Sequence, residues 1–224
     1  MRGVRLGFPV FLGYMPVGMA FGVIATTVGF SVVQATICSA TALAGAGQFI
    51  ALSLMRAGEG VVAVVAATTI VNLRYVLFGA TLSPHLRRTS VAGQAVLAFT
   101  LTDETFAINI TDRRSGLSTA MSMAGVGGVA WAGWVGGTVI GASAAAWIGD
   151  PSRFGVDFAM PAMFTALFIA LAEDRRHVVI GIVAAAVAIT LPALASLGLE
   201  VPTSWFIVVA TTVAATAGAV LFRE

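Results

Sequence analysis

The sequence has no lysine, one cysteine, two histidines and few charges of any kind. Charged side chains make up 10% of its 224 residues, against about 25% in soluble domains. Cys38 alone excludes an internal disulfide, and His85 and His177 have no second ligand of suitable type nearby, so neither a metal site nor any other cofactor is predicted. No nucleotide-binding loop, HExxH or GxSxG motif occurs, so neither an ATP-driven pump nor an enzyme is indicated.

Apolar residues make up 58% of the chain, and the mean hydropathy is +0.98. Apolar runs of about 20 residues recur along the chain, and a helix of that length crosses a bilayer core of about 30 Å. We therefore predict an all-α polytopic membrane protein with one transmembrane domain over 1–224. The first run is interpreted as a mature span, since no cleavage site follows it. The predicted segments are 7–29, 32–55, 60–82, 91–111, 118–148, 155–172, 177–198 and 203–222.

The arginines between these segments leave two topologies open. Eight full spans with a cytoplasmic N-terminus put eight arginines inside and three outside, as the positive-inside rule favours. If the second and sixth segments are re-entrant instead, eight arginines again lie inside and three outside, but they are not the same arginines. All twelve basic residues are arginines, and most lie between apolar segments, where they set the topology, so nucleic-acid binding is not indicated.

A weak internal repeat suggests two halves, about 1–115 and 116–224, with segments at 7–111 and 118–222. At a constant offset of 115, glycines of the first segment meet glycines of the fifth, and Phe49, Ala51 and Leu52 meet Phe164, Ala166 and Leu167. Duplicated halves around a midplane site are frequent in secondary transporters. The halves are parallel if all segments cross the membrane and inverted if the second and sixth are re-entrant.

The stretch "ALAGAGQFIALSL", residues 42–54, predicts an interrupted helix. Gly45 and Gly47 each weaken a helix by about 1 kcal/mol relative to alanine, and Gln48 adds a polar group at membrane depth. A helix that resumes at Gly45, Ala46, Gly47 and Gln48 offers N–H groups to an anion such as a substrate carboxylate. The alternative is that the glycines only allow close helix packing.

The stretch "LAFTLTDETFAINI", residues 97–110, places two acids inside an apolar segment. If 91–111 is one helix, Asp103 lies about 18 Å along its axis, near the midplane, with Glu104 beside it. Carboxylates at that depth are protonated, paired with a base or exposed to a water-filled cavity. We assign them to proton coupling or an ion pair. Asp157 is a weaker candidate of the same kind, with an interfacial helix cap as its alternative.

Arg74 lies within the third apolar segment, "TTIVNLRYVLFGATL" (68–82). Eight residues from the segment end, about 12 Å, its side chain has the reach to snorkel to the headgroups. Asn72 precedes it by two residues, and the acids of the next segment suggest instead a pair with Asp103 or Glu104, or a bidentate grip on a substrate carboxylate. Asn72 and Arg74 are therefore candidate substrate-binding residues.

Five motifs resemble the AzlC family, the large subunit of branched-chain amino acid exporters. They are "GYMPVGMAFGVIA" (13–25), "AGAGQFIAL" (44–52), "NLRYVLFGATLSPHL" (72–86), "TDETFA" (102–107) and "DFAMPAMFTAL" (157–167). The resemblance implies proton-driven export of leucine, isoleucine, valine and related neutral amino acids across the bacterial inner membrane. It also implies a small AzlD-type membrane subunit as partner, and a homo-oligomer is a further possibility.

Within that expectation, the substrate carboxylate meets the resumed helix near Gly45–Gln48 or Arg74, and the ammonium meets Asp103 or Glu104. One of the two acids then exchanges a proton during transport. Two other classes stay open at this point. A passive channel for neutral amino acids differs from a transporter in showing no saturation and no response to a proton gradient, and a non-transporting scaffold subunit differs in showing no substrate binding.

Overall fold

The structure is a computed structural model that describes residues 1–148, 174–195 and 206–221, with positions 158, 162, 165, 168, 169 and 172. Every regular element in these ranges is a helix, as predicted. The chain divides into two compact units, 1–162 and 163–224, which are considered separately. Three helical stretches in the described ranges are long and apolar enough to cross a membrane: Arg2–Thr27, Val61–Leu86 and Ala120–Ala145.

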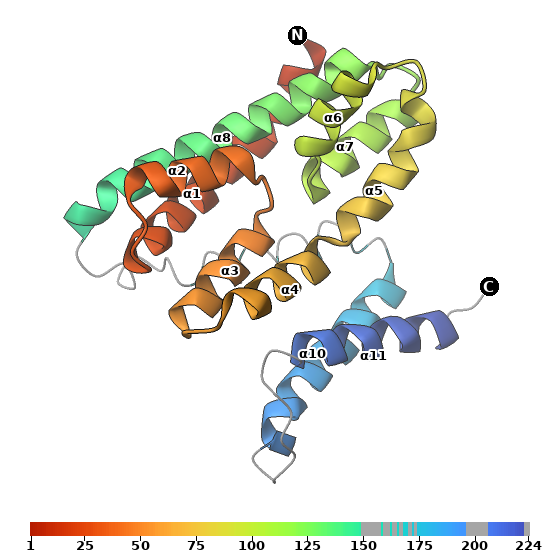
Figure 1. Ribbon diagram of the computed structural model, residues 1–224. Coiled ribbons are helices and arrows are strands. Elements are labelled where there is room, and N and C mark those ends of the chain that lie inside the picture. The colour runs from red at the N-terminus through yellow and green to blue at the C-terminus, as the bar shows by residue number, and fades with distance from the viewer. Residues whose placement is uncertain are drawn as a thin grey trace. The chain divides into compact units, whose positions relative to one another are not determined.

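Helices α1 (Arg2–Thr27) and α8 (Ala120–Ile148) form the centre of the first unit and run in the same direction (Figure 1). A Cβ added to Gly3 meets the backbone of Ser122, whereas one added to Gly22 meets the backbone of Thr138 and Ala142. The two backbones are therefore too close for side chains between them, as in small-residue packing of membrane helices. Because the helices are parallel, both begin at the same end of the unit.

Segment 32–55 is a hairpin of two short helices, α2 (Val32–Thr41) and α3 (Ala46–Arg56). Ser31 starts α2 with a capping box. Helix α2 runs back along α8, since Ser39 Oγ lies 2.7 Å from Thr138 Oγ1 and Trp131 Nε1 donates to the Ala40 carbonyl. After residues 42–45 the chain reverses into α3 (Figure 1). The interruption lies where the glycines predict it, and Gly45 has φ +33°, which favours glycine.

Segment 60–82 traverses the unit as α4 (Val61–Asn72) and α5 (Arg74–Leu82), extended by the 3₁₀ turn η1 (Ser83–Leu86). The stretch Val61–Leu86 is long enough to cross a membrane, as the sequence predicts, and a turn at Leu73, whose φ of −55° and ψ of −27° are helical, divides it into two helices. Arg74 is thus the first residue of a new helix rather than a point within a regular one. The traverse runs opposite to α1 (Figure 1).

Segment 91–111 is also not the continuous helix that the sequence predicts. Helix α6 (Val91–Phe99) ends before Thr100, and α7 (Asp103–Arg114) begins after Thr102. Thr102 and Thr105 form a capping box: Thr102 Oγ1 accepts from Thr105 N–H, and Thr105 Oγ1 accepts from Thr102 N–H. Threonine competes with helical backbone hydrogen bonding through such bonds, so this threonine-rich stretch starts a new helix.

The segment of α6 and α7 is a hairpin whose two ends lie at the same end of the unit. Arg113, near the end of α7, donates to the carbonyls of Ser118 and His85, which precede α8 and α6. Asp112 is paired with Arg2 at the start of α1. Both ends of the hairpin therefore lie beside the N-terminus, and its tip at 100–102 points toward the middle of the unit (Figure 1).

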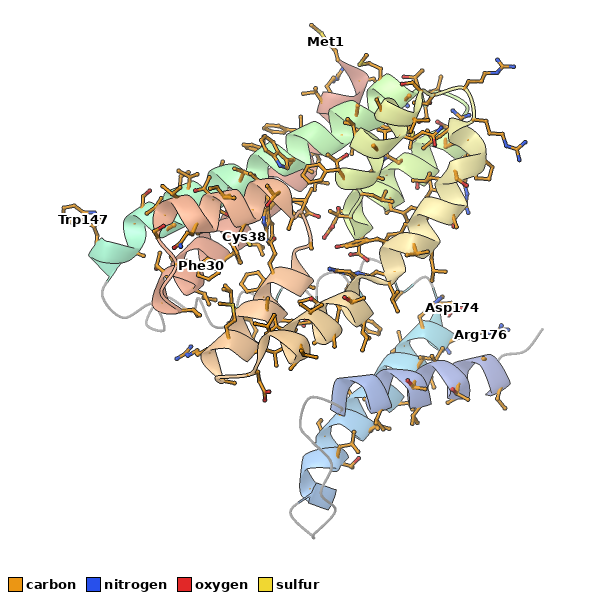
Figure 2. All side chains as sticks on the ribbon, in the orientation of Figure 1. Met1, Phe30, Cys38, Trp147, Asp174 and Arg176 are labelled. Carbon is orange, nitrogen blue, oxygen red and sulfur yellow. The ribbon has the colours of Figure 1, made fainter. Side chains whose placement is uncertain are left out.

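The two hairpins thus enter the unit from opposite ends. Each of the four short helices has 9 to 12 residues, about 14 to 18 Å, or half of a bilayer core. Figure 2 shows Met1 at one end of the unit and Phe30 and Trp147 toward the other. We interpret the second and fourth segments as re-entrant, between the crossings α1, α4–α5 and α8. The predictions considered eight full spans or re-entrant second and sixth segments, and neither anticipated a hairpin in the fourth segment.

The second unit contains α10 (Arg175–Ala195) and α11 (Phe206–Leu221). Asp174 precedes α10, and its carboxylate accepts hydrogen bonds from the N–H groups of Arg176 and His177 at 2.8 and 3.1 Å. These bonds, the one from His177 N–H foremost, hold the pKa of Asp174 below its usual value. Most of the sixth predicted segment, including Asp157, lies outside the described residues, and the duplication of two halves stays a prediction.

Candidate functional site at the helix interruptions

Arg74 and Asp103 form an ion pair where two interrupted segments meet. Arg74 Nη2 lies 3.0 Å from Asp103 Oδ2, and the side chains are 26% and 10% exposed. Each residue is the first of its helix, α5 or α7. The sequence leaves open whether Arg74 pairs with Asp103 or Glu104, and the structure selects Asp103. The guanidinium points inward to this carboxylate, so the snorkelling alternative does not describe its position.

Glu104 has a different partner from its neighbour. The hydroxyl of Tyr14, in the middle of α1, donates a short hydrogen bond to Glu104 Oε2 and lies 2.8 Å from Thr102 Oγ1. Tyr14 is 7% exposed and Thr102 is 4% exposed, so this contact is inside the unit. The start of α7 is therefore tied to α5 through Asp103 and to α1 through Glu104.

The start of α3 lies against the same group of elements. A Cβ on Gly47 would come within 3.0 Å of both side-chain amide atoms of Asn72, and one on Gly45 would touch the ring of Trp134 at 3.9 Å. Glycine at 47 therefore allows the close approach of Asn72. One expectation is corrected: the N–H groups of Gly47 and Gln48 already donate to the carbonyls of Ala44 and Gly45, so they are not free for an anion.

The contacts connect the elements in a closed ring. Tyr14 packs edge-on against Trp134, with ring centroids 5.5 Å apart, and Trp134 packs edge-on against Phe49 of α3, with ring centroids 6.3 Å apart. From α3 the ring continues through the Asn72 contact with Gly47, and it closes through the Arg74 and Asp103 pair and the bond between Glu104 and Tyr14. The two hairpin tips and the α4–α5 interruption thus surround one region in the middle of the unit.

Several buried polar atoms of this region have no hydrogen-bond partner among the described residues. They are Gln48 Oε1, Asn72 Oδ1, Arg74 Nε and Trp134 Nε1. Unpartnered polar atoms are uncommon in folded interiors because each loses its hydration without compensation. Here the set includes both donors and acceptors, which suits a ligand that carries both.

The charges and dipoles of the region favour anionic side chains at the start of α7. Asp103 and Glu104 occupy the first turn, where the N–H groups and the helix dipole attract negative charge. With Arg74, the cluster holds one basic and two acidic side chains. A zwitterion matches this set, because Arg74 attracts a carboxylate and the acids attract an ammonium.

Sequence reasoning missed Tyr14 and Trp134 as members of the site. Tyr14 is one of only two tyrosines in the chain, and a phenol in the middle of an apolar segment is a signal that needs a partner at membrane depth. Trp134 gives no such signal, because a tryptophan in an apolar helix equally suits a core. It packs with Phe21 and Phe49, which keeps the α3 start against α1 and α8.

The fold and the site define a helical membrane protein with a charged centre built from interrupted helices. The chain matches the family described as AzlC protein over residues 9–148, and it belongs to that family. It is 31% identical to inner membrane protein YgaZ of Escherichia coli K12, over 79% of this chain and 74% of that protein.

Further relatives cover a similar part of the chain. The branched-chain amino acid transport protein AzlC of Bacillus subtilis 168 is 28% identical, over 75% of this chain and 66% of that protein. An uncharacterized membrane protein of Archaeoglobus fulgidus is 30% identical, over 62% of this chain and 60% of that protein. No solved structure matches the chain.

Proposed function

We propose that this protein is a secondary transporter that exports branched-chain and related neutral amino acids from the bacterial cytoplasm. The observation that carries the proposal is the Arg74 and Asp103 ion pair at the meeting point of the interrupted helices. Ionisable side chains at such depth are costly, and they commonly belong to substrate or ion pathways. Family membership supports a transport function, and the name of the Bacillus subtilis relative supports the substrate class.

The substrate zwitterion inserts into the ion pair in this proposal. Its carboxylate binds the Arg74 guanidinium, whose Nε has no partner in the described structure, and the start of α3 lies beside it. Its ammonium binds Asp103, with the amide oxygens of Gln48 and Asn72 as further acceptors. Exchange of one ion pair for two new ones keeps every charge compensated, which limits the cost of carrying a zwitterion through a low-dielectric site.

A binding comparison of valine with two truncated analogues tests this arrangement. Isobutylamine lacks the carboxylate, and isovalerate lacks the ammonium. The melting temperature of the purified chain is measured in detergent, with and without a co-expressed AzlD-type subunit. It should rise with valine and leucine but not with either analogue. An equal rise with isovalerate would contradict the ammonium site, and no rise with any amino acid favours a scaffold subunit.

Transport itself is tested in proteoliposomes loaded with valine. A transporter shows saturation and exchange of internal for external valine, and a proton-coupled one shows efflux accelerated by a pH gradient. Flux that does not saturate and ignores the gradient identifies a passive channel. Arg56→Ala is the matched control for substitutions at Arg74, because Arg56 is an exposed arginine at the end of α3.

The distribution of arginines supports a cytoplasmic N-terminus. At the end of the first unit where α1 begins lie Arg2, Arg5, Arg87, Arg88, Arg113 and Arg114, whereas Arg56 lies at the opposite end. Positive side chains are enriched in cytoplasmic loops. This asymmetry is stronger than in either topology drawn from sequence, because the α6–α7 hairpin returns Arg113 and Arg114 to the side of Arg87 and Arg88.

Single cysteines in a Cys38→Ser background test both the orientation and the hairpin. We expect His85→Cys and Ser115→Cys, on either side of α6 and α7, to react with a membrane-impermeant maleimide only after permeabilisation of cells. Glu59→Cys, between α3 and α4, should react in intact cells. Opposite accessibility of positions 85 and 115 would show that the fourth segment crosses the membrane.

A further inference from the structure

The two adjacent carboxylates at the start of α7 have partners of different chemistry. Asp103 is paired with a guanidinium, and Glu104 accepts a hydrogen bond from a neutral phenol. We propose that Glu104, positioned by Tyr14, is the group that carries the coupled proton, whereas Asp103 stays ionised beside Arg74. This inference rests on the proposed function, since it names the proton carrier of the same site.

Asp103 is a poor proton carrier because of Arg74. A guanidinium stays protonated under all physiological conditions. If Asp103 took up a proton, Arg74 would be left as an uncompensated positive charge in a site where its side chain is 26% exposed. Breaking a buried pair in this way is strongly unfavourable. Asp103 therefore changes partner, from Arg74 to the substrate ammonium, without changing its charge.

Glu104 has no such constraint. Among the described residues, Glu104 interacts with the ionisable groups of Tyr14 from α1, Tyr75 from α5 and Asp103 from α7, and Arg74 of α5 lies beside Asp103. The single positive charge among them is already paired with Asp103, and the neighbouring helices α6 and α8 contain no ionisable side chain. Protonation of Glu104 thus removes a negative charge that no described cation compensates, and it leaves the ion pair intact.

The proton step balances without any other reactant. On the outer side, a Glu104 carboxylate oxygen forms an O–H bond with a proton from hydronium and leaves water. On the cytoplasmic side, that O–H bond breaks and water accepts the proton. One proton thus enters while one zwitterionic substrate leaves, and no electrons are transferred.

Tyr14 can accommodate both states of Glu104 because it has two acceptors. Its hydroxyl donates to the ionised Glu104, and Thr102 Oγ1 is 2.8 Å away. When Glu104 is protonated, its O–H can donate to the phenol oxygen while the phenol turns to Thr102. Thr102 also caps α7 by accepting a hydrogen bond from Thr105 N–H. Protonation of Glu104 therefore changes the hydrogen bonding of the residue that caps this helix. Tyr14 is a positioning residue in this scheme.

Glu104→Gln and Asp103→Asn in valine-loaded proteoliposomes test the assignment. We expect Glu104→Gln to lose the acceleration of valine efflux by a pH gradient, because glutamine accepts the Tyr14 bond but takes up no proton, and its valine exchange should fall far less than that of Asp103→Asn. Asp103→Asn should lose both exchange and gradient-driven efflux. Glu59→Gln, the same substitution at an exposed turn residue, is the control and should change neither.

Tyr14→Phe provides a second variant that removes only a hydroxyl. Its exchange should persist, whereas the pH profile of its gradient-driven efflux should differ from that of the wild type, since the Glu104 carboxylate loses the hydroxyl that positions it. A wild-type gradient response in Glu104→Gln, or exchange without gradient response in Asp103→Asn, would overturn the assignment. Absence of exchange in the wild type would instead contradict the proposed transport function.

Discussion

In the part of the chain that the structure describes, two arginine and aspartate pairs involve opposite ends of the same helix, α7. Asp103 begins α7 and pairs with Arg74 in the middle of the first unit, whereas Asp112 lies near the end of α7 and pairs with Arg2. The arginine side chain is 26% exposed in the inner pair and 46% in the outer pair. The aspartates are about equally buried, at 10% and 7% exposed, so the two pairs differ in the exposure of their arginines. Water reaches the outer pair through Arg2 and weakens it, whereas Arg74 is more shielded and depends more on its partner.

Loss of one partner of the inner pair should have the largest effect. Arg74→Ala leaves Asp103 without its cation, and we expect a loss of about 3 kcal/mol in the free energy of unfolding and transport below about 1% of wild type. Arg74→Lys should recover stability but not transport, because an ammonium lacks the planar fork that binds a carboxylate. The measurements are detergent unfolding and valine exchange. Full transport by Arg74→Lys would refute bidentate binding.

Swapping the two charged residues within each pair should have the next largest effect and should distinguish the inner pair from the outer pair. Arg74→Asp with Asp103→Arg restores an ion pair but reverses its direction at the start of α7, so we expect more stability than in either single variant and no transport. Arg2→Asp with Asp112→Arg should transport valine at a rate within about twofold of the wild type. Transport by the inner double variant would show that only charge balance matters there.

Removal of the outer pair should have a small effect that salt abolishes. In Asp112→Asn we expect the melting temperature to change by about 1 °C or less. The remaining difference from wild type should vanish in 1 M salt, where the Debye length is about 3 Å. The inner pair should show no such salt dependence. A large loss of stability in Asp112→Asn would place the outer pair in the same class as the inner one.

The smallest effect is expected at Asp174, a third acid at a helix start. Backbone N–H bonds, chiefly from His177, lower its pKa in the folded chain. The associated stabilisation is present at neutral pH, above the unfolded pKa, and is lost as pH falls below about 4 through the folded value. The difference in melting temperature between wild type and Asp174→Ala should therefore shrink from pH 7 to pH 3. An unchanged difference would contradict the role of the ionised carboxylate.

The segments and the candidate residues could be predicted from the sequence because membrane burial has a strong linear signal. A helix in lipid needs about 20 apolar residues, so Arg74, Asp103 and Glu104 are conspicuous where they interrupt such runs. The interruption before Ala46 could also be predicted, since glycine both weakens a helix and supports the positive φ of Gly45.

The interruptions at Leu73 and at 100–102 could not be predicted in the same way. No glycine or proline lies at either point, and threonine occurs in regular membrane helices as well. Helix α7 starts with a reciprocal capping box. Tyr14 and Arg74 bond to residues at its start, and Arg2 bonds to Asp112 near its end. Those partners are 29 to 110 positions away from their contacts in the chain, so local propensity contains no record of them.

The sequence by itself determines that this chain is a helical membrane protein of the AzlC family and that it holds ionisable groups at membrane depth. Composition and spacing suffice for that, because solvation by lipid acts on each segment separately. The tertiary structure alone decides that the second and fourth segments turn back as opposed hairpins and that Arg74 pairs with Asp103 while Glu104 faces Tyr14. Those choices depend on which helix ends meet, and that is set by packing among distant segments.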